Sequence, residues 1–447
     1  MPPGSVPSHR RREFTAFIEA LDGKYVAVLA GLRRSGKSTL IHQAIEELLA
    51  RGVKAKDIVY ATFDDLAFLG SGPEVIQAVL DVREDVGGPA TGGPIYAFFD
   101  EVQNIPEWGR ALKVIWDRRT GVRLSATGSS GLIIRGVVGE SLAGRATTMD
   151  IGPLEFRDWV TIASPTGGWG GQGAIPLAGL RNGSPPEDAF GGALEVLKAR
   201  DAVRPFLGRY LILGGLPEST SATDETAYLN HIFESVIERI LFRDLPSLYG
   251  LRQPDKIARL LLLLADKSGL PVSVDGVAET LKAHRETIED YISFLIGSRV
   301  ILEMLPYTGS EISSARKRRR YYLADTGLQN TILHRDSRSL LDDRVMGCIA
   351  EQAVAIHLNR LARRHWARLF TGPVHRGSEV DFVLDARDGP MPVECKYKGS
   401  VRGNEVASLD AYRKAIGAGT AIMVTKDRFE RRGGCVLLPL WMFLLTE

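Results

Sequence analysis

Residues 31–38 read Gly31-Leu32-Arg33-Arg34-Ser35-Gly36-Lys37-Ser38, a complete G-x-x-x-x-G-K-S phosphate-binding loop. The apolar segment 25–30 precedes the loop and is typical of a strand buried on both faces. Residues 39–49 follow with apolar side chains at helical spacing. A strand, a glycine-rich loop and a helix in this order are the context in which the motif holds phosphates. The stretch therefore predicts an α/β P-loop NTPase domain with a parallel sheet.

Each position of the loop has an expected task. The glycines let backbone N–H groups wrap the phosphates, and the N-terminus of the following helix adds a favourable dipole. Lys37 is expected to reach the β- and γ-phosphates, and the Ser38 hydroxyl to ligate Mg²⁺. We therefore expect ATP and Mg²⁺ as cofactors, held by Gly31, Arg33, Arg34, Ser35, Gly36, Lys37, Ser38, Thr39 and Asp100.

A second motif, residues 96–101, consists of four apolar residues followed by Asp100 and Glu101. A buried strand of this kind delivers two carboxylates beside the phosphate loop. Asp100 is expected to hold Mg²⁺, and Glu101 to polarise the attacking water. The alternative is an exposed acidic turn after a core strand, but the position of the motif behind the phosphate loop favours a Walker B motif.

Two further residues are candidates for nucleotide sensing. The segment 122–127 reads as a strand and is followed by Ser129, which we prefer over Thr127 as the hydroxyl that senses the γ-phosphate. Arg145 is a candidate arginine finger, a role that needs a neighbouring subunit or a closing lid. A homo-oligomer would supply that neighbour, and a plain surface arginine is the alternative.

The length and pattern of the chain indicate several domains. With 447 residues the chain exceeds what one core supports. Strand-like segments at 57–63 and 94–99 alternate with helical ones, which predicts a parallel sheet wrapped by helices. We expect an ATPase domain with a helical lid over residues 1–250, a Gly/Pro-rich insertion at about 164–192, a winged helix over 251–330 and a small α/β domain over 331–447.

Composition excludes few classes of protein. The formal net charge of +2 is nearly balanced, and the three cysteines are far apart, with no metal-type spacing. Such cysteine usage fits a reducing cytosol, so we expect a cytoplasmic protein. The apolar run 260–265 is far too short to span a bilayer, and no membrane partner is expected.

The spacing of these motifs resembles an AAA+-like ATPase clade common in archaea and bacteria. The features that carry the resemblance are the phosphate loop, the Walker B stretch 100–103, the later stretch 142–146 and the Gly-Gly-Leu-Pro turn at 214–217. It covers roughly residues 10–250. Many such ATPases carry a winged helix and a C-terminal domain of nuclease-like fold, and the resemblance implies both here.

Residues 251–324 have the outline of a winged helix-turn-helix, with helical patterns at 256–267, 274–283 and 285–299 and strand-like segments at 300–304 and 320–323. The third helix begins with three acids among seven residues, which phosphates would repel. The better candidates for contacts with the DNA backbone are Arg316, Lys317, Arg318, Arg319 and Arg320. A solvated basic loop or a protein-docking winged helix is the alternative.

The C-terminal region carries a group of acids and one lysine. In a hairpin of strands 379–384 and 391–396, Asp381 lies across from the strand of Glu394, and the alternation of side chains puts Glu394 and Lys396 on one face. Asp381 and Glu394 offer hard oxygen ligands that suit Mg²⁺ or Mn²⁺. Lys396 would orient water or steady the charge of the transition state, and Glu351, on a helix over 347–360, would hydrogen-bond or bind a second metal.

This set resembles the PD-(D/E)xK nuclease superfamily, which includes restriction-endonuclease-like and Holliday-junction-resolvase-like members. The resemblance implies that Asp381, Glu394, Lys396 and Glu351 cut DNA. A salt-bridged hairpin without chemistry, or a fold that only binds DNA, remains the alternative. We therefore expect an ATP-dependent DNA-processing protein that cleaves branched or end structures.

Two other classes of protein stay open. One is an ATP-driven switch whose C-terminal domain only binds DNA or a partner protein. The other is a sequence-specific regulator, against which the acidic third helix argues.

Overall fold

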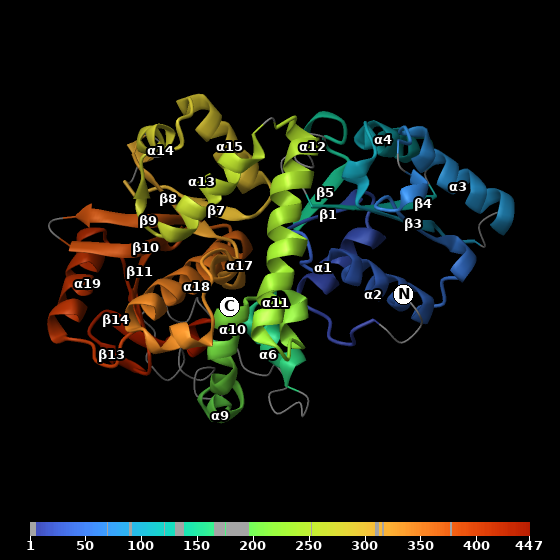
Figure 1. Cartoon of the computed structure of the whole chain (residues 1–447). Coiled ribbons are helices and arrows are strands. Elements are labelled where there is room, and N and C mark those ends of the chain that lie inside the picture. Colours follow the sequence, from blue (N-terminus) through green and yellow to red (C-terminus); the bar gives the residue numbers. More distant parts are fainter. Residues whose placement is uncertain are drawn as a thin grey trace. The chain divides into compact units, whose positions relative to one another are not determined.

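The computed structural model describes residues 6–68, 70–88, 92–119, 121–129, 138–164, 175, 196–251, 253–308, 313–314, 317–375 and 378–447. The chain forms two compact units, Met1–Pro153 with Gly297–Arg299, and Leu154–Ile296 with Val300–Glu447 (Figure 1). Most of the insertion expected at about 164–192 lies outside the described residues. No helix of the described part is long and apolar enough to cross a membrane.

The first unit is built on a five-stranded sheet in the order β2-β3-β4-β1-β5. Every neighbouring pair is parallel, so the expected parallel sheet is confirmed. All four strands expected from the sequence are present, and a fifth lies at the edge. The strands are β1 Val26–Ala30, β2 Ile58–Thr62, β3 Ile95–Asp100, β4 Val122–Gly128 and β5 Ala146–Asp150.

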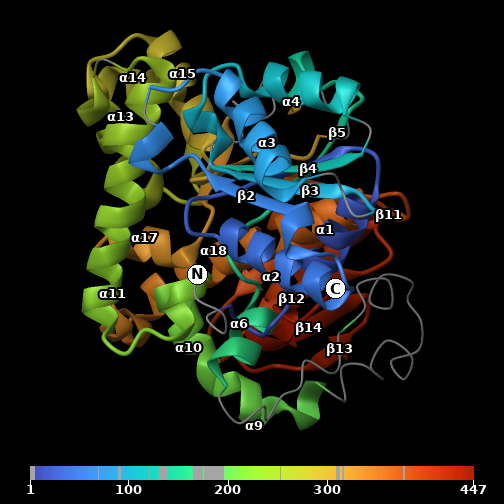
Figure 2. The same ribbon diagram turned by 90° about the vertical axis from the view of Figure 1, so that its right-hand side faces the viewer.

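Helices cover both faces of this sheet (Figures 1 and 2). All five residues of β1 are buried, and their side chains alternate between two cores. Val26 and Val28 pack in the core that holds helices α3 (Glu74–Gly87) and α4 (Trp108–Arg118). Ala27 and Leu29 pack in the core of α1 (Glu13–Asp22) and α2 (Lys37–Ala50). Burial on both faces explains why this strand reads as a continuous apolar run.

The second unit begins with helices. A turn at Gly214 docks onto Asp325, because the N–H of Gly215 donates to Asp325 Oδ2 at 2.7 Å. Residues 154–250, the last part of the expected ATPase domain, belong to this second compact unit. The helices here are α6 Phe156–Ala163, α9 Arg200–Val203, α10 Leu207–Leu213, α11 Glu225–Ile232, π-helical segments Phe233–Glu238 and Ile240–Asp244, α12 Leu245–Tyr249 and α17 Thr326–Ile332.

The next region contains the three helices and two strands that the sequence predicts. A short additional strand, β6, pairs antiparallel with β8, and β8 pairs antiparallel with β7. The side chain of Ser273 caps α14 by accepting from the N–H of Gly276. The elements are α13 Pro254–Asp266, β6 Pro271–Val272, α14 Val274–Leu281, α15 Arg285–Gly297, β7 Ile301–Met304 and β8 Arg319–Leu323.

The C-terminal region is a mixed sheet of six strands in the order β13-β14-β12-β11-β10-β9. The expected hairpin is confirmed as the antiparallel pair β10 and β11. The sequence analysis missed β9, because Gly372 and Pro373 within it are typical of turns. The elements are α18 Asp343–Arg364, β9 Arg368–His375, β10 Ser378–Ala386, β11 Gly389–Lys396, α19 Gly403–Ala415, β12 Ala421–Thr425, β13 Glu430–Arg432, β14 Cys435–Pro439 and α20 Leu440–Phe443.

Candidate functional sites

The phosphate loop joins the end of β1 to the start of α2. Gly36, with φ +96°, is the N-cap of α2 and adopts a backbone conformation that favours glycine. A Cβ at Gly31 would lie 2.0 Å from the carbonyl oxygen of Ile151, so only glycine fits there. Lys37 Nζ donates to the carbonyl oxygens of Gly31 at 3.2 Å and Leu32 at 3.1 Å. The ammonium group thus lies inside the curve of the loop, where phosphate oxygens would replace these two carbonyls.

The two expected magnesium ligands are in direct contact. Ser38 Oγ donates to Asp100 Oδ2 at 2.6 Å, and the Tyr60 hydroxyl donates to the same oxygen at 3.0 Å. The hydroxyl of Thr127 donates to the other carboxylate oxygen. Three hydroxyl groups therefore orient a carboxylate that is only 3% exposed. A hydroxyl and a carboxylate held together at the end of a phosphate loop fit Mg²⁺ bound to a nucleotide.

Glu101 belongs to a small polar network at the ends of β3 and β4. Its backbone has φ +55°, and its N–H donates to Thr127 Oγ1 at 3.1 Å. The side-chain amide of Gln103 donates to the Glu101 carboxylate and to Ser129 Oγ, the latter at 3.2 Å. Thr127 thus contacts both acids, whereas Ser129 reaches Glu101 through Gln103. The sequence analysis assigned no role to Gln103, although it forms part of the Walker B stretch.

Arg145 lies at the amino ends of the parallel strands, whereas the phosphate loop lies at their carboxyl ends. It precedes β5, and its carbonyl oxygen accepts from the N–H of Val26 at the start of β1. The length of β1, roughly 15 Å, separates it from the loop. The guanidinium group pairs with Asp117 at 3.1 Å and lies 5.3 Å from the ring of Trp116. Arg145 therefore does not face the phosphate loop of its own unit, which leaves a neighbour's nucleotide or a surface ion pair.

The remaining residues of the phosphate loop have different surroundings, and Ser35 contacts the segment before α1. Arg11, which the sequence analysis did not single out, is only 7% exposed and donates to the carbonyl oxygens of Ser35 at 2.9 Å and Gly152 at 3.0 Å. Arg33 pairs with Asp64 at 3.7 Å, and Arg34 has φ +63°. Thr39 lies in the first turn of α2. Arg11 was missed because nothing in the run Arg10-Arg11-Arg12 marks which arginine reaches the phosphate loop.

The C-terminal acids lie where β10 and β11 run side by side. The register between β10 and β9 shifts from Val380↔Gly372 to Phe382↔Thr371, so Asp381 sits at a β-bulge without a partner on β9. Its N–H donates to Glu394 Oε2 at 3.1 Å, and its Oδ2 accepts from the N–H of Cys395 at 2.7 Å. The structure thus brings Asp381 and Glu394 together, as the sequence predicts.

Lys396 and Glu351 complete this group from two sides. Lys396 pairs with Glu394, and both line a cleft of about 300 Å³ that is also bordered by Glu379 of β10 and Ser408 of α19. Glu351 is carried on α18, and its Oε1 accepts from the hydroxyl of Tyr322 at 2.9 Å. The four predicted residues therefore come from three elements and meet beside one cleft.

Burial and mutual repulsion perturb the pKa values of these carboxyl groups. Burial, with the charge of Asp381, raises the pKa of Glu351 to about 8 and that of Glu394 to about 7. Burial also raises the pKa of Asp381. Burial alone would lower the pKa of Lys396, but the charge of Glu394 and its hydrogen bond raise it overall. Bringing a cation close to these carboxylates would relieve their repulsion.

The acids of this site would supply only some of the oxygen ligands of a Mg²⁺ ion. Among the described residues, no three His, Cys, Asp or Glu side chains are grouped so as to hold a metal ion. Asp381 and Glu394 are two carboxylates held close together. Two carboxylates suit Mg²⁺, which keeps several waters and takes further oxygens from a phosphate substrate. Glu351 accepts a hydrogen bond from the Tyr322 hydroxyl, which is one of the two roles expected for it from the sequence.

The basic stretch expected to form the wing is not one exposed surface. Arg316 lies outside the described residues, and Lys317 and Arg318 are exposed. Arg319 pairs with Glu303 at 2.7 Å, whereas Arg320 pairs with Glu379 of the C-terminal sheet. The hollow between α15 and the β7–β8 hairpin, about 670 Å³ in volume, is lined by both signs of charge. Within the described part of the run, Lys317 and Arg318 are thus exposed, whereas Arg319 and Arg320 form ion pairs within the protein.

Three segments of the chain match family models of known proteins. Residues 23–160 match the family model AAA_14, described as an AAA domain. Residues 205–339 and 346–443 match two domains of unknown function, DUF8612 and DUF4143. Residues 23–160 therefore form a Walker-type P-loop ATPase domain, and ATP with Mg²⁺ is its expected cofactor.

Several uncharacterized proteins are similar to most of the chain at low identity. An uncharacterized protein of Methanocaldococcus jannaschii is 26% identical over 371 residues, covering 81% of this chain and 73% of its own. One of Haemophilus influenzae is 22% identical over 426 residues, covering 91% and 92%. Among solved structures, a Walker-type ATPase of Pyrococcus abyssi is 16% identical, with a TM-score of 0.43, covering 73% of this chain and 95% of its own.

Proposed function

We propose that the protein is an ATP-driven DNA-processing enzyme. In this proposal the P-loop domain hydrolyses ATP and the C-terminal domain cuts DNA phosphodiester bonds. The observation that carries the second half is the meeting of Asp381, Glu394 and Lys396 beside one cleft, with Glu351 adjoining them. Acids and a lysine of this kind beside an open cleft suit hydrolysis of a phosphate ester.

In the ATPase half, Lys37 binds the phosphates in place of the loop carbonyls that it now contacts. When bound, Mg²⁺ neutralises charge on the β- and γ-phosphates, and Ser38 and Asp100 are the residues that would hold it. Glu101 orients and polarises the attacking water. Thr127 and Gln103 keep Glu101 in place through the hydrogen bonds described above, and they connect it with the end of β4.

In the nuclease half, Asp381 and Glu394 would hold Mg²⁺ or Mn²⁺, which supplies Lewis acidity at the scissile phosphate. Lys396, which now pairs with Glu394, is placed to orient the attacking water and to steady charge on the phosphate. The exposed Lys317 and Arg318 would contact the DNA backbone without reading its sequence.

The test is a cleavage assay with pure protein and Mn²⁺. Plasmid, single-stranded, flapped and four-way-junction DNA would be incubated with wild type, Lys396→Ala and Lys414→Ala, with and without ATP. Lys414 is a matched control, because it is a surface lysine, 67% exposed, that pairs with Asp410 on α19. We expect cutting by wild type and by the Lys414 variant, and its loss in the Lys396 variant. Equal cutting by all three proteins, or none by any, would refute the nuclease half.

A second function is favoured by one feature of the same site. Each acid of the group already has a partner within the protein, since Glu351 contacts Tyr322, Asp381 contacts the N–H of Cys395 and Glu394 pairs with Lys396. An internally satisfied site suits an ATP-driven switch whose C-terminal domain binds DNA or a protein without cutting. Nucleotide-dependent binding of DNA or a partner, with no metal-dependent cleavage, is the result expected of such a switch.

A further inference from the structure

We propose that Arg320, carried by the β6-β8-β7 sheet, is a phosphate-binding residue of the C-terminal cleft, and that Glu379 holds its guanidinium group until a phosphate arrives. This inference rests on the proposed nuclease function and deepens it. It adds to the cleft a residue from outside the C-terminal domain, and it names the ligand class as a nucleic-acid phosphate.

The alternation of side chains along β8 divides its polar residues between two faces. Arg319 and Tyr321 lie on the same face of the sheet as Glu303 of β7, and they contact it at 2.7 Å and 3.4 Å respectively. Arg320 and Tyr322 point the other way, toward the acids of the C-terminal domain. Arg320 contacts Glu379 and Tyr322 contacts Glu351. One strand thus brings a cation to Glu379, at the border of the cleft, and a hydroxyl group to Glu351.

The position of Arg320 is fixed by contacts around β8. The backbone that follows β7 pairs with β9, because Thr371 donates its N–H to Leu305 at 2.9 Å and accepts from Tyr307 at 2.8 Å. Ser268, just before β6, donates its hydroxyl to Gln352 of α18 at 2.8 Å. The region around the β6-β8-β7 sheet is therefore joined by hydrogen bonds to β9 and to α18, at two places within one unit. A side chain supported in this way is prepared for binding at little entropic cost.

Glu379 has the properties of a temporary partner. Its side chain is 49% exposed, whereas that of Arg320 is only 14% exposed. It also borders the cleft that Glu394 and Lys396 line. An exposed carboxylate can turn away into water. A buried guanidinium group left without an anionic partner is unfavourable, so a phosphate would replace the carboxylate. A phosphate entering the cleft would offer two oxygens in the planar geometry that arginine prefers.

Binding of a short DNA strand tests this inference without any cleavage. Fluorescence anisotropy of a labelled twelve-nucleotide oligo-dT would be measured in EDTA at fixed ionic strength. We expect Arg320→Gln to weaken binding about 10- to 100-fold, as for loss of a charge-assisted hydrogen bond. We expect Glu379→Gln to tighten binding, because the competing anion is gone. In the double variant the gain from Glu379→Gln should vanish.

An ion pair elsewhere in the six-stranded C-terminal sheet provides the matched control. Arg432 pairs with Glu430 at 2.9 Å on β13, at one edge of the sheet. Arg432→Gln and Glu430→Gln remove the same charges but should change binding only slightly, through long-range electrostatics. Equal changes in binding from substitutions at the two pairs would overturn the inference, because the net charge of the protein would then explain the effect. Thermal melting of each variant checks folding, and Arg320→Lys keeps the test usable should Arg320→Gln melt early.

The inference and the proposed function fail in different ways. Loss of oligonucleotide binding in Arg320→Gln, together with tighter binding in Glu379→Gln, supports the phosphate site even where no DNA is cut. Cleavage that depends on Lys396 but binding that ignores Arg320 and Glu379 would overturn the inference and leave the nuclease function standing.

Discussion

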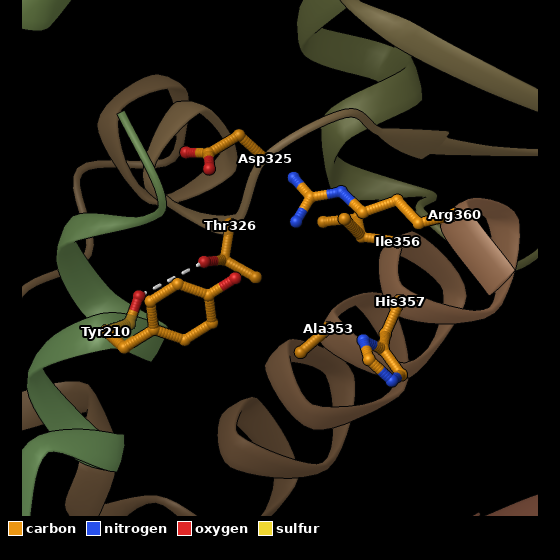
Figure 3. Close-up of a pocket in the computed structure, with 7 residues that line it drawn as sticks. All are labelled: Tyr210, Asp325, Thr326, Ala353, Ile356, His357 and Arg360. Atoms are coloured by element: carbon orange, nitrogen blue, oxygen red, sulfur yellow. Dashed lines mark hydrogen bonds between the residues drawn. The ribbon is translucent and has the colours of Figure 1, made fainter. Parts of the chain in front are cut away.

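His357 offers a prediction whose size follows from the structure. It lies on α18, the helix that carries Glu351, and its Nε2 is 2.9 Å from Thr446 Oγ1. The ring packs against Phe443 and borders an enclosed pocket of about 10 Å³ that Tyr210, Asp325 and Arg360 also line (Figure 3). Burial lowers the pKa of His357 from 6.5 to about 4.

The sign of the effect follows from the direction of this shift. The folded pKa lies below the unfolded one, so His357 stays neutral in the folded protein while the unfolded chain takes up a proton. Its contribution to stability is complete above pH 6.5 and is lost as pH falls toward 4. Between pH 7.5 and pH 5 the shift amounts to about 2 kcal/mol, or about thirty-fold in the opening equilibrium of α18.

Native-state hydrogen exchange of α18 peptides, read by mass spectrometry, measures this opening in a chain of several domains. Wild type would be compared with His357→Gln, which retains a group that can hydrogen-bond Thr446. At each pH the ratio of the two proteins' protection factors cancels the intrinsic exchange rate. The ratio also cancels the opposing trend from buried acids such as Asp325, whose pKa burial raises.

We expect the ratio of wild-type to variant protection to fall about thirty-fold from pH 7.5 to pH 5. His284→Gln serves as the control, because His284 is an exposed residue outside the C-terminal domain, and it should leave the pH dependence of wild type unchanged. A ratio that stays constant over this range would show that His357 is not held neutral by burial, and the reasoning would fail.

Three other predictions concern the ATPase and the fold. Thr127→Val should lower kcat for ATP about 10- to 100-fold and more than Ser129→Ala does, because Thr127 contacts both acids; a larger loss in the Ser129 variant would reverse this ranking. If Arg145 acts on a neighbour's nucleotide, Arg145→Ala and Lys37→Ala should each be inactive, and an equal mixture should regain about a quarter of wild-type turnover; a mixture as inactive as its parts argues for a surface role. Gly214→Ala should destabilise the second unit by about 3 kcal/mol or more in denaturant titrations, because φ is +76° and the new Cβ would lie 2.0 Å from Asp325 Oδ1. Gly347→Ala, with open space around it, is the control, and equal midpoints for the two variants would contradict the clash.

The P-loop domain was largely readable from the sequence. Its strands are buried on both faces and appear as apolar runs, and the phosphate loop is a local motif whose backbone shape depends on its own glycines. The contact between Ser38 and Asp100 follows from their places in the motifs, since Asp100 ends β3 and Ser38 lies in the first turn of α2, after the loop at the carboxyl end of β1. The contacts of Arg11 and Gln103 could not be predicted, because they depend on neighbouring residues that no local sequence pattern specifies.

The candidate site in the C-terminal domain was readable in part. Alternation along β11 places Glu394 and Lys396 on one face, and the hairpin sets Asp381 opposite Glu394. The bulge at Asp381 depends on β9, a strand whose Gly-Pro pair hides it. The edge strand β13 and its neighbour β14 were missed as well, so the sequence predicted the hairpin but not the full sheet.

By itself, the sequence determined the phosphate loop, the Walker B acids and the hairpin of the C-terminal site, since each depends on residues close together in the chain or on the period of a strand. Only the tertiary structure decided the partner of Arg320. In the sequence it belongs to a continuous basic run, which suggests one exposed surface. Strand pairing turns Arg319 toward Glu303 and Arg320 toward Glu379, 59 residues away. The packing of sheets and helices decides which charged residue lies beside a side chain at that separation in the chain. The local sequence pattern does not specify it.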